Sequence, residues 1–240
     1  MATTRIEIAT ADGVAPAFEL GAPSSPRVLL LSDGLGMRPA MHEISERLAE
    51  AGYRVLMPDL FYRLGPYTAP DPRVLFSDPE VRAEWGRRHE ASKTTAANLV
   101  RDLRAYLDHL GDARCGVVGY CMGGRLALVA AATYPERIAA VAAYHPGGLV
   151  TDAPDSPHLQ LGRIRARVYI GAASADPTFT DEQREVVDDA LTAGGVDHAV
   201  ELYPARHGWV PSDTPVHDAA ATERHWETLL ALLGSALSPS

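Results

Sequence analysis

The sequence predicts an α/β fold built on a mostly parallel, doubly wound sheet flanked by helices. Short apolar runs typical of buried strands alternate with longer segments of helical periodicity along most of the 240 residues. A sharp, glycine-flanked turn joins one apolar run, residues 115–118, to a helix. Polar residues suited to catalysis follow two later runs, at the strand ends where open α/β sheets place their sites.

An N-terminal β-hairpin is expected over residues 5–20, because alternating segments flank the turn-forming pair Asp12-Gly13. Further strands are expected at 28–31, 53–57, 138–144, 168–171 and 199–203, and helices near 40–51, 80–110, 180–193 and 218–234. Whether the long 80–110 helix breaks near Gly86 is left open. The segments 61–79 and 145–163 are predicted to be loops that could form a cap over the site.

The composition is that of an ordinary globular protein, with 46% hydrophobic and 22% charged residues. Its length fits a single domain over residues 1–240. A net charge of −9 without a Lys/Arg cluster argues against a nucleic-acid partner. No apolar run approaches the ~18 residues of a membrane span, and the N-terminus lacks a signal-peptide core. We expect a cytoplasmic monomer or homodimer without membrane association.

The two cysteines, Cys115 and Cys121, are predicted to be free thiols. An extended chain between them would separate them by roughly 20 Å at ~3.3 Å per residue, whereas a disulfide needs Cα atoms within about 7 Å. Free thiols suit a reducing compartment. Cys115 is expected to be a small apolar core residue.

The turn after residues 115–118 predicts a nucleophile at Cys121. Its sequence, Gly119-Tyr120-Cys121-Met122-Gly123-Gly124, matches the strand–nucleophile–helix turn known as the nucleophile elbow, with Cys in place of Ser. Gly119 and Gly123 would remove side chains that collide in this strained turn. The positive end of the following helix would favour a thiolate. The alternative is a buried structural thiol.

Two further residues complete a predicted catalytic triad. Asp176 follows the strand at 168–171 and His207 follows the strand at 199–203, so the chain order is nucleophile, acid, base. A histidine base needs a carboxylate on its second nitrogen to fix its tautomer and hold the imidazolium. A surface loop histidine is the alternative for His207, and Asp152, Asp155 and Asp181 are rivals of Asp176.

At these residues the chain resembles the dienelactone hydrolase family of the α/β-hydrolase superfamily. The matching segments are the Cys121 elbow, Ala-Asp-Pro at 175–177 and Arg-His-Gly-Trp at 206–209, and the likeness spans nearly the whole chain. The resemblance implies a cofactor-independent hydrolase in which Cys121 attacks an ester or lactone carbonyl to give an acyl-thioester. His207 would act as base and then acid, and Asp176 would orient it. The backbone N–H groups of Met122 and Gly34 would form the oxyanion hole.

The resemblance also assigns a catalytic role to Asp33. Family members carry a Glu in this loop that helps to activate the thiol, and the aligned residue here is Asp33, one methylene shorter. The alternative is a turn residue that hydrogen-bonds its own backbone.

Better-known members of the family bind a substrate carboxylate with arginines, one of them shortly after the triad histidine. Here Arg206 precedes His207, and Arg82 lies in the 80–110 helix. An apolar or aromatic acyl group is equally compatible with the sequence. The candidate substrate contacts are therefore Arg82, Trp85, Tyr144, His145, Arg206 and Trp209, with a structural role as the alternative for each aromatic residue.

Other functions stay open at this point. The same triad could serve an acyl transferase, a lyase or an isomerase, and a hydrolase-like pocket could bind a small molecule without turnover. No metal site is expected, because the spacing of His145 and His158 matches no compact zinc motif. A small ester or lactone is the expected partner, and no cofactor is expected.

Overall fold

The fold is organised around one eight-stranded sheet in the order β1-β2-β4-β3-β5-β6-β7-β8. The computed structural model describes residues 3–91 and 95–237. The strands are β1 (Thr4–Thr10), β2 (Gly13–Leu20), β3 (Arg27–Leu31), β4 (Arg54–Pro58), β5 (Cys115–Tyr120), β6 (Ile138–Tyr144), β7 (Arg167–Ala175) and β8 (His198–Arg206). From β4 onward in this order all neighbours are parallel, and only the β1–β2 hairpin and its junction with β4 are antiparallel.

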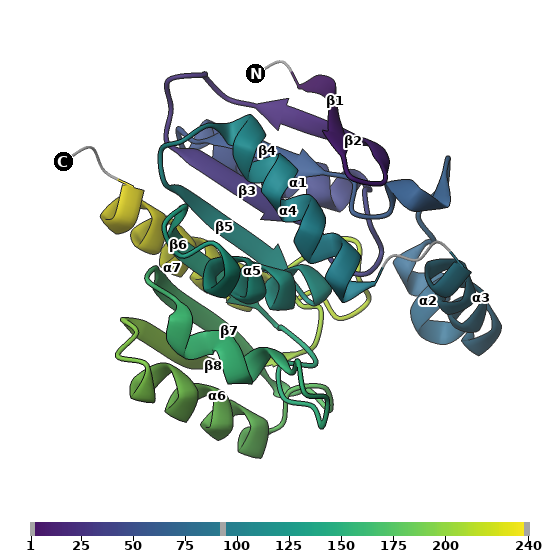
Figure 1. Ribbon diagram of the computed structural model, residues 1–240. Coiled ribbons are helices and arrows are strands. Elements are labelled where there is room, and N and C mark those ends of the chain that lie inside the picture. Colours follow the sequence, from purple (N-terminus) through teal and green to yellow (C-terminus); the bar gives the residue numbers. More distant parts are fainter. Residues whose placement is uncertain (1–2, 92–94, 238–240) are drawn as a thin grey trace.

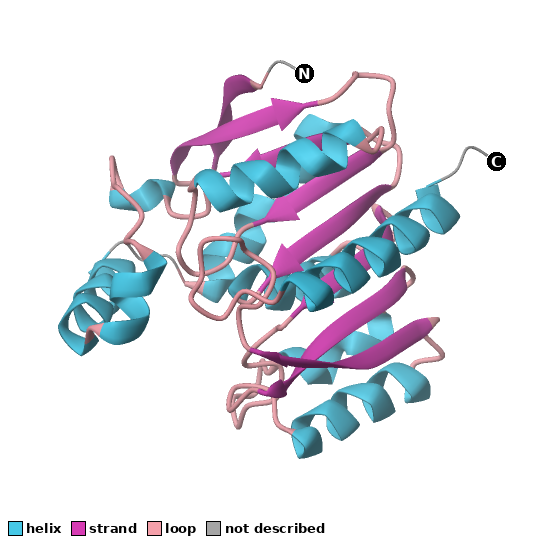
Figure 2. Cartoon of the chain, turned by 180° about the vertical axis from the view of Figure 1, so that it is seen from behind, coloured by secondary structure: helices cyan, strands magenta, loops and turns pink. Residues whose placement is uncertain are grey.

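Helices cover both faces of the sheet (Figures 1 and 2). The α-helices are α1 (Pro39–Glu50), α2 (Pro72–Ser77), α3 (Pro79–Ala91), α4 (Ala96–Leu110), α5 (Met122–Thr133), α6 (Asp181–Ala193) and α7 (Ala219–Leu237), with 3-10 turns at Tyr62–Leu64 and Pro157–Arg163. One buried core joins the sheet to α1 and α7, and the other joins it to α4, α5 and α6. The predicted α/β fold and the N-terminal hairpin are confirmed.

The strand β3 illustrates how the sequence produces these two cores. Val28 and Leu30 point to the α1/α7 side, whereas Leu29 and Leu31 point to the α4/α5/α6 side. All four side chains are fully buried. Because successive side chains on a strand face opposite ways, a strand buried on both faces becomes a continuous apolar run.

Two predictions for the middle of the chain are wrong. The expected 61–79 loop contains the short helix α2, which Asp71 caps by accepting a 2.8 Å hydrogen bond from the Arg73 N–H. The expected 80–110 helix is two helices, α3 and α4, and α4 begins after the side chain of Thr95 caps its first turn. Gly86 lies inside α3. An isolated glycine weakens a helix but does not by itself end it.

The carboxyl ends of the parallel strands meet at one edge of the sheet. Cys121, Asp176 and His207 each follow directly after a strand, respectively β5, β7 and β8. The α2–α3 hairpin stands out from the body of the molecule beyond this edge (Figure 1). The topology therefore brings three residues that are far apart in the sequence to one end of the fold.

Candidate active site

Cys121 occupies a strained backbone conformation between β5 and α5. Its φ of 54° and ψ of −115° lie in a region that residues with a side chain rarely adopt. A Cβ atom on Gly119 would lie 2.0 Å from the Gly123 carbonyl oxygen, and one on Gly123 would lie 2.3 Å from the Leu31 carbonyl oxygen. Both positions therefore require glycine, as the elbow sequence predicts. The Cys121 side chain is partly exposed.

His207 and Asp176 form the second part of the site. The Nδ1 atom of His207 lies 2.6 Å from Oδ2 of Asp176. The other carboxylate oxygen of Asp176 accepts hydrogen bonds from the Thr178 hydroxyl at 2.6 Å and from the Thr178 N–H at 2.8 Å. The carboxylate is thus held on both sides, and it fixes the orientation of the imidazole.

The electrostatics of this pair favour a charged histidine. Burial acts to lower the pKa of His207, but hydrogen bonds to Asp176 and Cys121 and the charge of Cys121 together raise it to about 10. Burial acts to raise the pKa of Asp176, but the hydrogen bonds from His207 and Thr178 hold it below its ordinary value. The arrangement therefore favours a positively charged imidazole held by the Asp176 carboxylate.

The loop after β3, which carries Asp33 and Gly34, is held by a buried ion pair. The Arg38 guanidinium donates to both Asp33 oxygens, at 2.7 and 2.9 Å, and to both oxygens of Asp213, at 2.8 and 3.2 Å. The Leu35 N–H also donates to Asp33, at 2.9 Å. Asp33 therefore makes the backbone turn contact that was the alternative to its catalytic role. The hydrogen bonds described for its carboxylate lead to Arg38 and Leu35, and direct activation of the thiol stays a prediction.

Trp85 supports the same loop from α3. Its indole N–H donates a 2.9 Å hydrogen bond to the Gly34 carbonyl oxygen, and its ring packs among Phe61, Tyr67 and His89. Only 7% of Trp85 is exposed. Trp85 therefore supports the loop, and its role as a substrate wall stays a prediction.

Three other predicted substrate contacts are buried in the structure. Tyr144 is fully buried against α7, where its hydroxyl meets the His225 carbonyl oxygen at 3.2 Å. Trp209 is fully buried and stacks on Tyr203, with 4.9 Å between ring centroids. His145 is also fully buried. All three residues are buried, and their predicted substrate contacts stay predictions.

His145 lies directly beside the triad histidine. Its ring centroid is 5.1 Å from that of His207 and 4.8 Å from that of Trp209. Burial, followed by the charges of His207 and His225, holds the pKa of His145 well below its ordinary value. The backbone of His145 has a φ of 37°, and its imidazole packs against that of His207. A substrate contact for His145 stays a prediction.

The two predicted arginines lie in different surroundings. Arg82 donates to the Phe76 carbonyl oxygen at 2.8 Å and to the Leu75 carbonyl oxygen at 3.3 Å, so it caps α2 within the hairpin. Arg206 is the last residue of β8 and is exposed next to His207. Arg82 therefore contributes to the hairpin, and a substrate role for Arg82 or Arg206 stays a prediction.

Sequence reasoning missed two residues of the site, Thr178 and Arg38. Thr178 lies in the turn after Asp176, where a hydroxyl two residues after the acid is a usable signal. Arg38 carried no such signal, because its partners lie in two loops that only the folded chain brings together.

The two cysteines are free, as predicted. Burial raises the pKa of Cys115 to about 12, so this thiol is inert at neutral pH. Among residues 3–91 and 95–237, no cluster of His, Cys, Asp and Glu has the arrangement of a metal site. Within the same ranges, no helix has the length and apolar character needed to cross a bilayer.

The fold and the arrangement of Cys121, Asp176 and His207 define the α/β-hydrolase class. The model of the dienelactone hydrolase family matches residues 16–237. The chain therefore belongs to the dienelactone hydrolase family of ester and lactone hydrolases.

Known relatives agree with this assignment. The carboxymethylenebutenolidase of Rhodococcus opacus is 32% identical over 210 residues, which cover 85% of this chain and 79% of the relative. A dienelactone hydrolase-like promiscuous phosphotriesterase from metagenomic libraries matches with a TM-score of 0.76 at 22% identity, over 99% of both chains. The dienelactone hydrolase of Anabaena variabilis matches with a TM-score of 0.70 at 17% identity, again over 99% of both chains. The two structural matches support the fold.

Proposed function

We propose that this protein hydrolyses a small ester or lactone through a covalent acyl-thioester on Cys121. The observation that carries the proposal is geometric: Cys121 lies in the strained elbow at the start of α5, and Nδ1 of His207 lies 2.6 Å from Oδ2 of Asp176. A histidine base oriented by a carboxylate can activate a cysteine, whose nucleophilic form is the thiolate. The position of the sulfur at the start of α5 adds the favourable end of a helix dipole.

The first half of the reaction forms the acyl-thioester. The Cys121 thiolate attacks the carbonyl carbon, and the carbonyl π electrons move to the oxygen to give a tetrahedral oxyanion. When the C–O bond to the leaving alkoxide breaks, the His207 imidazolium gives the alkoxide its proton. In a lactone the leaving alkoxide stays attached, so this step opens the ring.

The oxyanion would be stabilised by two backbone N–H groups, those of Met122 and Gly34. Met122 is the first residue of α5, and the first N–H groups of a helix have no partner within the helix. Gly34 lies in the loop held by the Arg38–Asp33 ion pair and the Trp85 hydrogen bond. Donors that are fixed before the reaction need no reorganisation when the charge develops.

The second half releases the acid. Neutral His207 takes a proton from water, the resulting hydroxide attacks the thioester carbonyl, and the C–S bond breaks to restore the thiolate and the imidazolium. Asp176 stabilises the positive charge on His207 at both stages, and Thr178 keeps Asp176 in place. No external cofactor enters this scheme.

The substrate class follows from the family and from the exposed end of β8. The name of the Rhodococcus relative refers to a lactone, which supports lactones among the substrates. Arg206 is exposed beside His207 and would favour a substrate with an anionic group. Two free cysteines fit a reducing compartment, so a cytoplasmic location belongs to the proposal.

A panel of activated esters and small lactones, charged and neutral, tests the proposal. Hydrolysis should occur with the wild type and vanish in Cys121→Ala, whereas the matched variant Cys115→Ala should stay active because Cys115 is buried at the far end of β5. Added alcohols or amines should yield no ester or amide product. Full activity in Cys121→Ala would contradict the proposal, and transfer to the added acceptors would replace hydrolysis by acyl transfer.

A further inference from the structure

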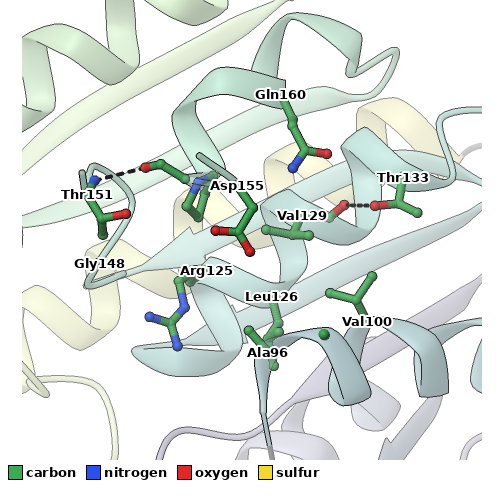
Figure 3. A pocket seen from close by; sticks show the side chains of 13 residues that line it. Ala96, Val100, Arg125, Leu126, Val129, Thr133, Gly148, Thr151, Asp155 and Gln160 are labelled. Atoms are coloured by element: carbon green, nitrogen blue, oxygen red, sulfur yellow. Dashed lines mark hydrogen bonds between the residues drawn. The ribbon is translucent and has the colours of Figure 1, made fainter. Parts of the chain in front are cut away.

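A pocket lies along α5, the helix that follows Cys121. Its volume is about 430 Å3, within the range of roughly 300–1,000 Å3 typical of small-molecule sites. The pocket is enclosed by the start of α4, by α5 and by the segment from Gly148 to Gln160 (Figure 3). Cys121, Asp176 and His207 are absent from its lining, so it is distinct from the triad.

Arg125 is the cationic group at one end of this pocket. It lies one helical turn after Cys121, and its Nε atom is buried without a hydrogen-bond partner. No hydrogen bond or ion pair joins its guanidinium to the part of the chain that the structure describes. A guanidinium partly removed from water without an acceptor favours an anion from solution.

The backbone next to Arg125 leaves room for its guanidinium. Gly148 has a φ of 66°, and a Cβ atom there would lie 2.8 Å from Nη1 of Arg125. Any side chain at this position would displace the guanidinium from the pocket. The adjacent Gly147 faces the other way, since its Cβ atom would lie 2.6 Å from Thr178 Oγ1 and 3.7 Å from His207 Cε1. The glycine pair therefore forms a thin wall between this pocket and the triad.

Apolar side chains of α4 and α5 line one part of the pocket, and the polar residues Thr133, Thr151, Ser156 and Gln160 line other parts. The apolar part includes Val100, Leu126 and Val129, and Figure 3 shows Val100 away from the end that holds Arg125. A ligand that suits Arg125 and this apolar part has an anionic head and a short apolar body. We infer that this pocket binds a small amphipathic carboxylate, with the carboxylate on Arg125 and the apolar body along α4 and α5. The inference does not depend on the catalytic role proposed for Cys121.

Asp155 lines the same end of the pocket, and its negative charge should oppose the binding of a carboxylate there. It forms no ion pair with Arg125, although both side chains lie in this pocket. Because Asp155 is exposed, water screens its charge more than that of the half-buried Arg125. A bound carboxylate would be attracted by Arg125 and repelled more weakly by Asp155. A zwitterion would instead use Asp155 for its cationic group.

The test is titration of hexanoate into the 15N-labelled Cys121→Ala variant, followed by amide chemical shifts. This variant excludes covalent reaction, so the result is independent of turnover. Saturable shifts are expected around Gly148 and the first turns of α5, and 1-hexanol should bind about tenfold more weakly because it lacks the charge. Equal binding of the two probes, or shifts confined to residues around His207, would overturn the inference.

Three further substitutions in the same background test which charges the ligand meets. Arg125→Gln should weaken hexanoate binding about tenfold or more, and Arg125→Lys should weaken it less, because the charge remains but the planar fork is lost. Asp155→Asn, on an exposed loop where folding tolerates change, should strengthen binding about two- to fivefold. Unchanged binding in folded Arg125→Gln, or weaker binding in Asp155→Asn, would contradict an anion site at Arg125.

Discussion

The indole N–H of Trp85 donates a 2.9 Å hydrogen bond to the carbonyl oxygen of Gly34. This contact links the α2–α3 hairpin to the loop that would supply one oxyanion donor. A hydrogen bond to the carbonyl of a residue restrains the orientation of the peptide units around it. The hairpin thereby takes part in the geometry of the proposed oxyanion hole, although it lies outside the sheet.

Trp85→Phe should lower kcat about tenfold with a smaller change in KM. Phenylalanine keeps an aromatic ring at this position but removes the hydrogen bond to the Gly34 carbonyl oxygen. Steady-state kinetics on an activated ester measure both constants. Arg88→Gln is the matched control. The guanidinium carbon of Arg88 lies 5.9 Å from the centroid of the Trp85 ring, so this change alters α3 beside Trp85 but keeps the indole N–H that bonds Gly34. An unchanged kcat in Trp85→Phe would refute the coupling.

Glycine at 123 should be indispensable to the elbow. In Gly123→Ala the new methyl group would meet the Leu31 carbonyl oxygen at 2.3 Å and the Ser32 carbonyl oxygen at 2.5 Å. The variant should lose about 2 kcal/mol or more of unfolding free energy, as expected for overpacking against backbone. Gly86→Ala in α3 meets no atom within 4 Å and should be neutral or stabilising by up to about 1 kcal/mol. Urea unfolding of the two variants compares them, and equal stability would contradict the steric argument.

The Thr178 hydroxyl should matter for catalysis through Asp176. Thr178→Val removes the 2.6 Å hydrogen bond to Asp176 Oδ1 and leaves a buried carboxylate oxygen with one fewer donor. We expect kcat to fall about tenfold, whereas Thr178→Ser should recover most of the activity. Activity in Thr178→Val equal to that of the wild type would show that the backbone N–H alone holds the carboxylate.

The buried ion pairs of Arg38 with Asp33 and Asp213 should stabilise the fold only while all three charged side chains are present. Arg38 is 4% exposed, and its guanidinium contacts Asp33 and Asp213. Arg38→Met leaves two carboxylates without their cation and should cost about 3–5 kcal/mol of unfolding free energy. Asp213→Asn, with its carboxylate 28% exposed, should cost less. Denaturant unfolding measures both losses, and the reverse order would contradict this ranking.

The pH dependence of stability follows from His207. Its pKa is raised to about 10 in the folded state, against about 6.5 in an unfolded chain. The stabilisation that this shift provides is complete below about pH 6.5 and is lost as the pH rises through about 10. The stability difference between wild type and His207→Gln should therefore shrink between about pH 7 and pH 10. A difference that grows over this interval would contradict the assigned shift.

The sequence allowed the sheet and the three residues at its edge to be predicted because both depend on local signals. Continuous apolar runs identify strands such as β6, and the flanking glycines identify Cys121. The break before α4 was missed because it depends on the Thr95 cap, whereas Gly86 offered a more obvious but incorrect signal. Periodicity alone does not distinguish one long helix from two consecutive helices.

The surroundings of the triad were harder to predict, since they depend on tertiary packing. Trp209 lies two residues after His207, and Tyr144 ends the strand β6, yet both side chains belong to the core between the sheet, α1 and α7. Arg38 and its partner Asp213 are 175 residues apart in the chain, so no local sequence pattern predicts their contact. Sequence position therefore does not reveal how deeply a residue near the triad is buried.

The most direct test of the central claim is the mass of the protein after rapid quenching with an activated ester. His207→Gln should retain Cys121 but hydrolyse the thioester slowly, so the acyl group should accumulate on the peptide that contains Cys121. The same treatment of the double variant Cys121→Ala/His207→Gln should give no added mass. Acylation of another residue, or wild-type turnover by Cys121→Ala, would contradict the proposed nucleophile.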